Sequence, residues 1–495
     1  MILSLAMGTV SQSFGILTDP AVLVAIFLGV VIGIIFGAIP GFSATMTIIL
    51  FTPVTIPFDA SVALIFLVSA YGGAVYAGSI PAILINTPGA PGSVVTCWDG
   101  YEFTKAGRAT YALAASAMAS GVAGIIAAAI LLLVGPALAE FALNFGPVEL
   151  FLLAVFALTI IPAAKGQSLL KGLLGGGFGL LIATIGSDPQ LAQPRAILGL
   201  PLLRSGVSFV VVLIGLFVFT EALFLATQKK IIDTDVNVTD DQRQVSEGIQ
   251  AVIDRPIEFI RGTFIGAFIG SLPGAGADVA NFISYNEAKR WASDPSKFGT
   301  GIIEGIIAAD SSNNATQGGA LIPTLTIGIP GSGSTAALLS AFAIHGLNPG
   351  PGLFQRSGVL VYALIFSLFL GNALILVFGL KGARHFGRLS RIPIKYIVPV
   401  VIVLAVIGAF AVRNAHLDVL IMVLFGLIGI ILVATDYPLV SVVIGVIVGG
   451  FAEEGFVQGW IINQSDPIRF LTTSDIAIVL LLLIAFSLGV TLIRD

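Results

Sequence analysis

A glycine-rich stretch in the second half of the chain has the spacing of a nucleotide-binding loop. The stretch GIPGSGST at residues 328–335 matches the P-loop pattern G-x-x-x-x-G-K-[ST] at Gly328, Gly333 and Thr335, but Ser334 occupies the lysine position. Without that lysine the loop lacks the group that reaches the outer phosphates, and it lies in an uncharged apolar segment. These residues favour a carboxylate site made of backbone N–H groups and hydroxyls over a nucleotide site.

Pro-Gly pairs at four places in apolar segments predict broken membrane helices. Proline removes a backbone donor and glycine adopts conformations that other residues avoid, so each pair should interrupt a helix. Such a break is tolerated at membrane depth only when it is buried or lines a cavity. It also leaves a helix N-terminus with a partial positive charge. The predicted substrate-binding residues are therefore Pro40, Gly41, Ser43, Thr45, Asn86, Thr87, Pro88, Gly89, Pro273, Gly274, Pro330, Gly331, Ser332, Ser334 and Thr335. The alternative is that these loops serve only packing.

Polar residues near the second-half breaks suggest a site for a coupling cation. Asp278 follows Pro273 by five residues, and Asn281 lies on the same helix face. Together with Asn314, they offer oxygen ligands suited to sodium, or a proton acceptor if the carboxylate titrates. Two alternatives remain open: Asp278 caps its helix, or the nearby Asp310 is solvated at the membrane interface. No other cofactor is expected.

The composition is that of a polytopic membrane protein. Of 495 residues, 57% are hydrophobic and 10% are charged, whereas soluble domains have about 25% charged residues. The hydrophobic runs are long enough for about ten to twelve membrane segments, several of them short enough to be re-entrant. The predicted fold class is an all-α membrane protein with broken or re-entrant helices.

Two pairs of similar motifs indicate a twofold internal repeat. GAIPGFSAT at 37–45 resembles GSLPGAGAD at 270–278, and PAILINTPGAPGS at 81–93 resembles PTLTIGIPGSGST at 323–335, in the same order. Interrupted apolar segments at matching places in two halves are typical of a secondary transporter's binding site. The predicted organisation is a first repeat half at 1–226, a polar linker at 227–256 and a second half at 257–495.

Other function classes find little support in the sequence. One cysteine and three widely spaced histidines form no metal motif or nucleophile arrangement, which weakens the case for an enzyme. The net charge of −4 and the absence of a basic stripe argue against a nucleic-acid partner. Residues 1–12 have no basic residue or cleavage motif and are interpreted as a mature N-terminus.

Nearly the whole chain resembles the large membrane subunit of the tripartite tricarboxylate transporters. The resemblance rests on GAIPG at 37–41, YGGAVYAGSIPAILINTPGAPGSVVTCWDGY at 71–101, GSDPQLAQPRAILG at 186–199, GSLPGAGADVANFISYNEAKR at 270–290, and NNATQGGALIPTLTIGIPGSG at 313–333, which continues to HGLNPGPGLF at 345–354. The family usually has glutamate before the Asn-Asn pair, where this chain has Asp310. The resemblance therefore assigns no role to that position.

The resemblance implies a function and a set of partners. It implies a translocating subunit for citrate-like di- and tricarboxylates, driven by a cation gradient of Na⁺ or H⁺ in the bacterial inner membrane. Its implied partners are a small membrane subunit and a periplasmic solute-binding protein. The main competing hypothesis is an anion-conducting channel, since broken helices also suit pores. A membrane-embedded enzyme and a non-transporting scaffold are weaker hypotheses.

Overall fold

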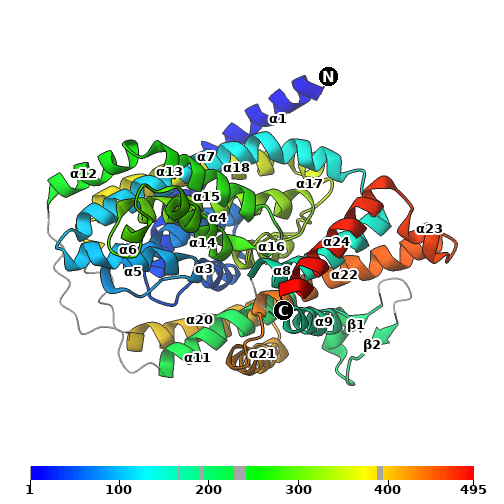
Figure 1. The fold of residues 1–495 in the computed structure, drawn as a ribbon. Helices are drawn as coiled ribbons and strands as arrows, with labels where there is room; N and C mark the ends of the chain where they lie inside the picture. The colour runs from blue at the N-terminus through cyan, green and yellow to red at the C-terminus, as the bar shows by residue number, and fades with distance from the viewer. Residues whose placement is uncertain (1, 166–167, 189–192, 228–240, 387–393, 495) are drawn as a thin grey trace.

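The computed structural model describes residues 2–165, 168–188, 193–227, 241–386 and 394–494, which are almost entirely helical (Figure 1). The first half contains α1 Ile2–Leu17, α2 Pro20–Gly37, α3 Ala44–Phe51, α4 Ala60–Ala77, α5 Ser79–Ile85, α6 Val94–Lys105, α7 Ala109–Ala142, α8 Pro147–Lys165, α9 Leu169–Ala183, the paired strands β1 Gly186–Ser187 and β2 Pro194–Arg195, α10 Phe209–Leu213, a π-helical segment Ile214–Phe219 and α11 Thr220–Thr227.

The second half repeats this helical character without a strand in its described residues. It contains α12 Gln242–Ile253, α13 Pro256–Gly270, α14 Gly276–Trp291, α15 Ile303–Thr326, α16 Gly333–Ile344, α17 Leu353–Arg356, α18 Gly358–Gly382, α20 Ile394–Arg413, α21 His416–Ala434, α22 Leu439–Ile462, α23 Pro467–Leu471 and α24 Asp475–Arg494. The all-α prediction is therefore confirmed.

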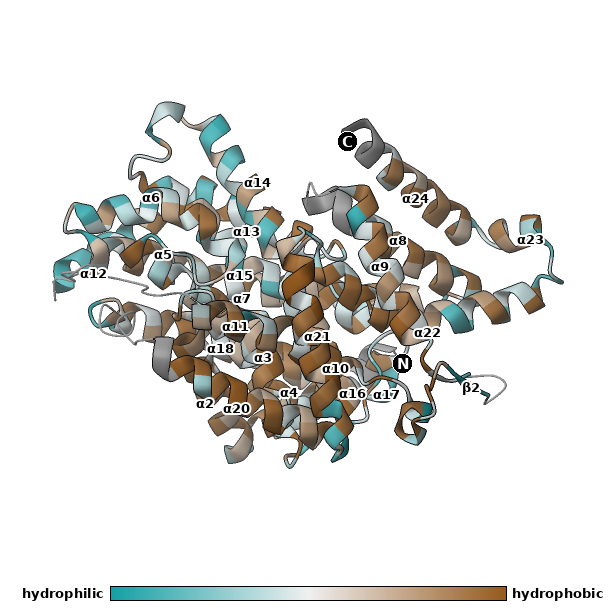
Figure 2. Cartoon of the chain, turned by 90° about the horizontal axis from the view of Figure 1, so that it is seen from below, coloured by the Kyte–Doolittle hydropathy of each residue, from teal (hydrophilic) through white to brown (hydrophobic). Residues whose placement is uncertain are grey.

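Seven helices in the described part of the chain are long and apolar enough to cross a membrane. Shorter apolar helices, including Ala44–Thr55 and Gly333–Ile344, fall below the length needed to span alone. The expected ten to twelve segments thus require shorter helices to enter the membrane as well, and that number stays a prediction. Figure 2 shows apolar residues over α2, α20 and α21, whereas polar residues gather on α6, α12 and α14.

The helices pack as two groups. Helices α2–α7 pack with α12–α18, while α8–α11 pack with α20–α24, which lie below and to the right in Figure 1. The largest buried apolar cluster joins the two groups, because Ile48 of α3 and Phe342 of α16 share it with Leu216 and Met422. The surface between the groups is therefore where the broken helices meet their neighbours.

Corresponding glycines in the two halves make corresponding contacts. A Cβ atom added at Gly29, Gly33 or Gly37 of α2 would lie 2.3–2.4 Å from a carbonyl oxygen of α4, contributed by Phe66, Ala70 and Ala74 in turn. In the second half, Gly262, Gly266 and Gly270 of α13 approach the carbonyl oxygens of Ala308, Ser312 and Thr316 of α15 in the same order, at 2.2–2.8 Å. The spacing is constant, 233 residues for the glycines and 242 for their partners. These contacts agree with the predicted repeat, which remains a prediction.

The predicted linker contains a packed helix. Residues 228–240 lie outside the described residues, but Gln242–Ile253 forms α12 against α7. Gly248 permits this packing, since an added Cβ would lie 2.5 Å from the carbonyl oxygen of Tyr111. The salt bridge from Arg108 to Glu247, with 2.8 Å between Nη2 and Oε2, adds a polar contact at the edge of the same interface.

Candidate functional site

The helix breaks surround one cavity of about 520 Å³ that lies between the two helix groups. One wall is formed by the start of α3, the turn at residues 88–94, the start of α14 and the start of α16. The opposite wall is formed by Leu216 and Phe217 of the π segment, Glu221 of α11, and Leu439 of α22. Segments more than 200 residues apart in the sequence therefore form a single site.

Helix N-termini point into this cavity from both halves of the sequence. Ser43 caps α3 by accepting a hydrogen bond from the backbone N–H of Met46 at 3.3 Å. Ser332 caps α16 by accepting from the backbone N–H of Thr335 at 3.2 Å, while the Thr335 hydroxyl accepts from the Ser332 N–H at 2.9 Å. Both caps follow a Pro-Gly pair, as N-cap preferences predict. Their partial positive charges make the cavity suitable for an anion.

The other two Pro-Gly breaks also precede helices that begin near the cavity. The pair Pro88-Gly89 precedes a 3₁₀ turn at Pro91–Ser93 that leads into α6. The pair Pro273-Gly274 precedes α14, whose N-cap residue, Ala275, makes no side-chain capping bond. A positive φ of +73° at Gly274 explains why glycine is needed in that turn.

Direct contacts join the breaks across the site. The hydroxyls of Thr45 and Ser334 lie 3.0 Å apart and connect α3 of the first half to α16 of the second. Within the second half, the backbone N–H of Gly274 donates to the carbonyl oxygen of Pro330 at 3.3 Å. The broken segments thus support one another, and the fold holds the site in a defined shape.

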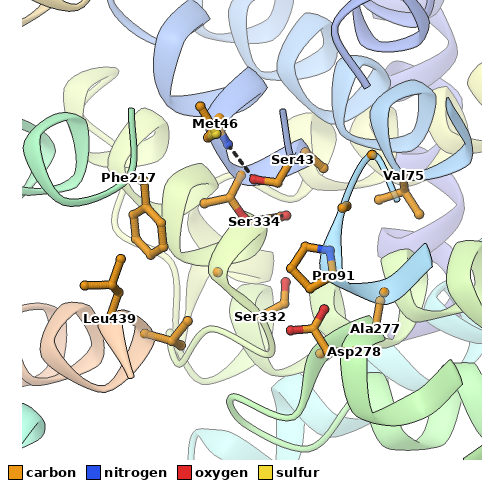
Figure 3. A pocket seen from close by; sticks show the side chains of 18 of the residues that line it. Ser43, Met46, Val75, Pro91, Phe217, Ala277, Asp278, Ser332, Ser334 and Leu439 are labelled. Carbon is orange, nitrogen blue, oxygen red and sulfur yellow. Dashed lines mark hydrogen bonds between the residues drawn. The ribbon is translucent and has the colours of Figure 1, made fainter. Parts of the chain in front are cut away.

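The charge on the cavity wall comes from two acids in the described part of the chain, Asp278 and Glu221, and no lysine or arginine lines it. Asp278 lies in the first turn of α14, with its carboxylate on the same side as the Ser332 hydroxyl in Figure 3. Glu221 belongs to the other helix group and faces the turn at Gly41, where an added Cβ would lie 3.2 Å from Oε1. The site therefore combines helix N-termini with carboxylates.

The structure places many of the predicted residues on the cavity wall, namely Gly41, Ser43, Thr45, Pro88, Gly89, Gly274, Asp278, Ser332 and Ser334. The other predicted residues are not part of that wall: Pro40, Asn86, Thr87, Pro273, Asn281, Asn314, Pro330, Gly331 and Thr335. Pro40, Pro273 and Pro330 shape the turns, and the three residues after Gly331 line the cavity in its place.

Three of these residues have other contacts that explain their positions. Asn86 is exposed at the left-handed end of α5 and borders a separate surface hollow. The Thr87 hydroxyl donates to the carbonyl oxygen of Ile85 at 3.3 Å. Asn281 is buried behind the wall, where Nδ2 donates to the carbonyl oxygen of Gly92 at 2.7 Å and to Asn313 Oδ1 at 3.1 Å.

The predicted cation ligands are only partly brought together. Asp278 reaches the cavity, whereas Asn314 is fully buried on α15 and no hydrogen bond of its side-chain amide is found among the described residues. The described residues contain no group of three or more His, Cys, Asp or Glu side chains that could hold a metal ion. A cation at Asp278 would therefore rely on hydroxyl and backbone oxygens in addition to the carboxylate.

Sequence reasoning missed most of the other residues on the wall, among them Glu221, Tyr71 and Asn313. An acid within an otherwise uncharged apolar run at 205–226 was a usable signal for Glu221, because ionisable residues inside membrane segments are usually functional. Asn313 stands beside the predicted Asn314, but helix geometry turns only Asn313 toward the cavity. Tyr71 gave no signal that separates it from a packing residue.

Comparison with known proteins identifies the family. Residues 23–444 match the Tripartite tricarboxylate transporter TctA family. A protein of Agrobacterium vitis, described as "Uncharacterized 52.8 kDa protein in TAR-I ttuC' 3'region", is 34% identical over 467 residues, which cover 94% of this chain and 92% of that protein. A second protein of the same organism, described as "Uncharacterized protein in TAR-II ttuC' 3'region", is 31% identical over 207 residues, 42% of this chain and 86% of that protein. The chain therefore belongs to the TctA family and is a multi-pass membrane subunit of a tripartite tricarboxylate transporter.

Proposed function

We propose that this subunit carries citrate-like di- and tricarboxylates through the cavity by cation-coupled uptake across the bacterial inner membrane. A periplasmic solute-binding protein delivers the substrate, and a small membrane subunit completes the complex. The coupling cation binds at Asp278, beside the substrate. The two halves act as structural repeats around this site, which the matched glycine contacts of α2 and α13 support.

The observation that carries this proposal is the convergence of helix N-termini and two carboxylates on one cavity. Backbone N–H groups and the Ser332 and Ser334 hydroxyls suit a carboxylate ligand. Asp278 and Glu221 would repel that ligand if both stayed ionised and uncompensated, because like charges interact strongly in a cavity of low dielectric constant. A cation or proton that enters with the substrate removes this repulsion, which favours coupled transport.

Uptake by the purified, reconstituted complex tests the proposal. Proteoliposomes that contain both membrane subunits, supplied with the binding protein and labelled citrate, should accumulate citrate against its gradient when an inward Na⁺ or H⁺ gradient is imposed. Uptake should saturate with citrate concentration and stop when the gradients are collapsed. Non-saturable flux that only follows the citrate gradient would instead support an anion-conducting channel.

Removing the Ser332 hydroxyl from the cavity wall should weaken citrate binding, whereas removing a hydroxyl outside the cavity should not. Ser332→Ala deletes a donor at the cavity and the cap of α16, and we expect citrate affinity to fall about tenfold or more because a hydrogen bond to a charged group is worth about 1.5–3 kcal/mol. Thr87→Ala serves as the matched control, since its hydroxyl is used by Ile85 outside the cavity. Equal citrate dissociation constants in Ser332→Ala and the parent would show that this hydroxyl does not bind citrate.

A further inference from the structure

A carboxylate that is not part of the cavity wall, Asp310 of α15, is completely buried. Its Oδ1 accepts hydrogen bonds from the hydroxyls of Ser79 at 2.8 Å and Thr96 at 2.7 Å. Its Oδ2 has no hydrogen-bond partner among the described residues. The hydroxyl of Ser116 on α7 also hydrogen-bonds to this carboxylate. The buried carboxylate is therefore surrounded by hydroxyl groups that carry no charge.

The surroundings of Asp310 offer no compensating charge. No ion pair of this carboxylate is found in the described part of the chain, and the titratable side chains that interact with it are Tyr76 on α4 and Cys97 on α6. Helices α5 and α7 contribute only the hydroxyls of Ser79 and Ser116 at this point. An ionised carboxylate in such a place is strongly disfavoured unless it acquires a positive partner. A proton on Oδ2 neutralises the group and needs no additional space.

Comparison of α15 with α4 shows that packing does not require this acid. The glycine contacts relate the two helices by 242 residues, which places Val68 of α4 at the position equivalent to Asp310. Asn313 and Asn314 likewise correspond to Tyr71 and Gly72. One helix thus fills this position with an apolar side chain, while the other buries a costly carboxylate there. The difference indicates a role other than packing.

Asp310 is linked to the substrate cavity by its own helix and by the two helices that donate hydrogen bonds to it. Asn313, one helical turn further along α15, lines the cavity, and its Nδ2 donates to the carbonyl oxygen of Val75 at 3.1 Å. Thr96 and Ser79, the hydroxyl donors to Asp310, belong to α6 and α5 on either side of the turn that carries Pro88-Gly89. A change in the charge of Asp310 therefore acts on the two helices that hold this turn in place.

We propose that Asp310 binds a proton that is transported together with the carboxylate substrate, at a site separate from the cation site at Asp278. Oδ2 takes a proton from water on the side where substrate enters and releases it to water on the other side, so the carboxylate is regenerated in each cycle. This inference rests on the proposed uptake function and adds an identified proton carrier to it.

The test compares uphill uptake with exchange in proteoliposomes that contain the complete complex. A gradient of one pH unit adds about tenfold to the accumulation of a substrate carried with one proton. Asp310→Asn should lose this gain while keeping citrate exchange across the membrane within about twofold of the parent, since a permanently neutral side chain resembles the protonated state. A merely structural role would reduce both activities together.

Asp99→Asn is the matched control, because Asp99 is also fully buried but completely hydrogen-bonded. Its Oδ1 accepts from the backbone N–H groups of Gly299, Gly301 and Ile302, and its Oδ2 accepts from the Tyr285 hydroxyl. The Asp99 variant should lower thermal stability and leave the gain from the pH gradient intact. Loss of the pH-driven gain in both variants to the same degree would overturn the assignment to Asp310.

Ser116→Ala provides a second variant that keeps the carboxylate. The Ser116 hydroxyl stabilises the ionised carboxylate, so removing it should shift the pH of half-maximal uptake upward by up to about one unit, because one hydrogen bond is worth about 0.5–1.5 kcal/mol. An unchanged pH profile in Ser116→Ala, or full pH-driven accumulation in Asp310→Asn, overturns the inference. If the parent complex responds to a Na⁺ gradient alone, the proposal that Asp310 carries a proton is wrong, while the proposed function stands. If no gradient drives uptake, the proposed function itself fails.

Discussion

Replacing Asp278 by asparagine should raise the Na⁺ concentration required for half-maximal citrate uptake about tenfold or more. Asp278 is an acid on the cavity wall and lies in the first turn of α14, where the helix emerges from the break. Losing its charge removes an ionic contact to a bound cation, and contacts of this kind are worth about 1.5–3 kcal/mol. The order in which the complex prefers different carboxylates should remain the same, because N–H groups and hydroxyls of the other helix starts still bind the substrate.

The matched control for this variant is Glu287→Gln on the same helix. Glu287 lies near the far end of α14, where its Oε2 accepts a hydrogen bond from Trp291 Nε1 at 3.1 Å and the residue borders a separate hollow. Its Na⁺ dependence should equal that of the parent. Titration of initial uptake rates with Na⁺ at fixed pH makes the comparison. A normal Na⁺ dependence in Asp278→Asn, combined with altered substrate preference, would show that Asp278 contacts the substrate instead of the cation.

The helix breaks were predictable because their causes are local. Proline and glycine act on their own backbone, so the sequence alone located the turns at Gly41, Gly89, Gly274 and Gly331. Helix caps follow the same logic, and Ser43 and Ser332 are N-caps as their residue type and position suggested. The expectation that these turns meet came from the ordered similarity of two motif pairs, and this was enough to anticipate one cavity.

The rest of the site depends on contacts between distant segments. Asp310 could have been solvated at the interface, and only the approach of Ser79, Thr96 and Ser116 from three other helices shows that it is buried. The residues of the opposite cavity wall were not predicted from the sequence either. Glu221 reaches it because α11 packs on α20 and the π-helical segment, which brings this side chain to the turn at Gly41, and no local pattern specifies that arrangement.

The residue types beside a turn also do not reveal which side chains face the cavity. Thr87 precedes a Pro-Gly pair and Ser332 follows one, and only Ser332 lines the cavity. Both turns have a left-handed residue at the equivalent position, Asn86 with φ of 54° and Gly328 with φ of 75°, so this feature does not distinguish them.

Alanine at Gly89 or at Gly331 should abolish citrate uptake, and the two variants should behave alike. An added Cβ at Gly89 would lie 2.5 Å from the carbonyl oxygen of Gly37, and one at Gly331 would lie 2.6 Å from the carbonyl oxygen of Gly270. These neighbours are backbone atoms at the ends of α2 and α13, so the clash with the added Cβ can be relieved only if the backbone of the turn moves. Overpacking of this kind costs about 1–3 kcal/mol, and here the strain falls on the turns that shape the cavity. Thermal unfolding and uptake of the reconstituted complex measure both effects.

Gly78 supplies an internal control, because the equivalent residue in the second half is an alanine, Ala320. Gly78 contacts Gly89 in the same way that Ala320 contacts Gly331, so the repeat tolerates a methyl group at this position. In Gly78→Ala the nearest atom to the new Cβ is the Ser93 hydroxyl oxygen at 2.8 Å, a side-chain end that can rotate. We expect Gly78→Ala to retain most uptake while Gly89→Ala loses it. Equal loss in both would mean that the whole turn rejects added volume, and that the constant spacing of 242 residues does not reflect equivalent environments.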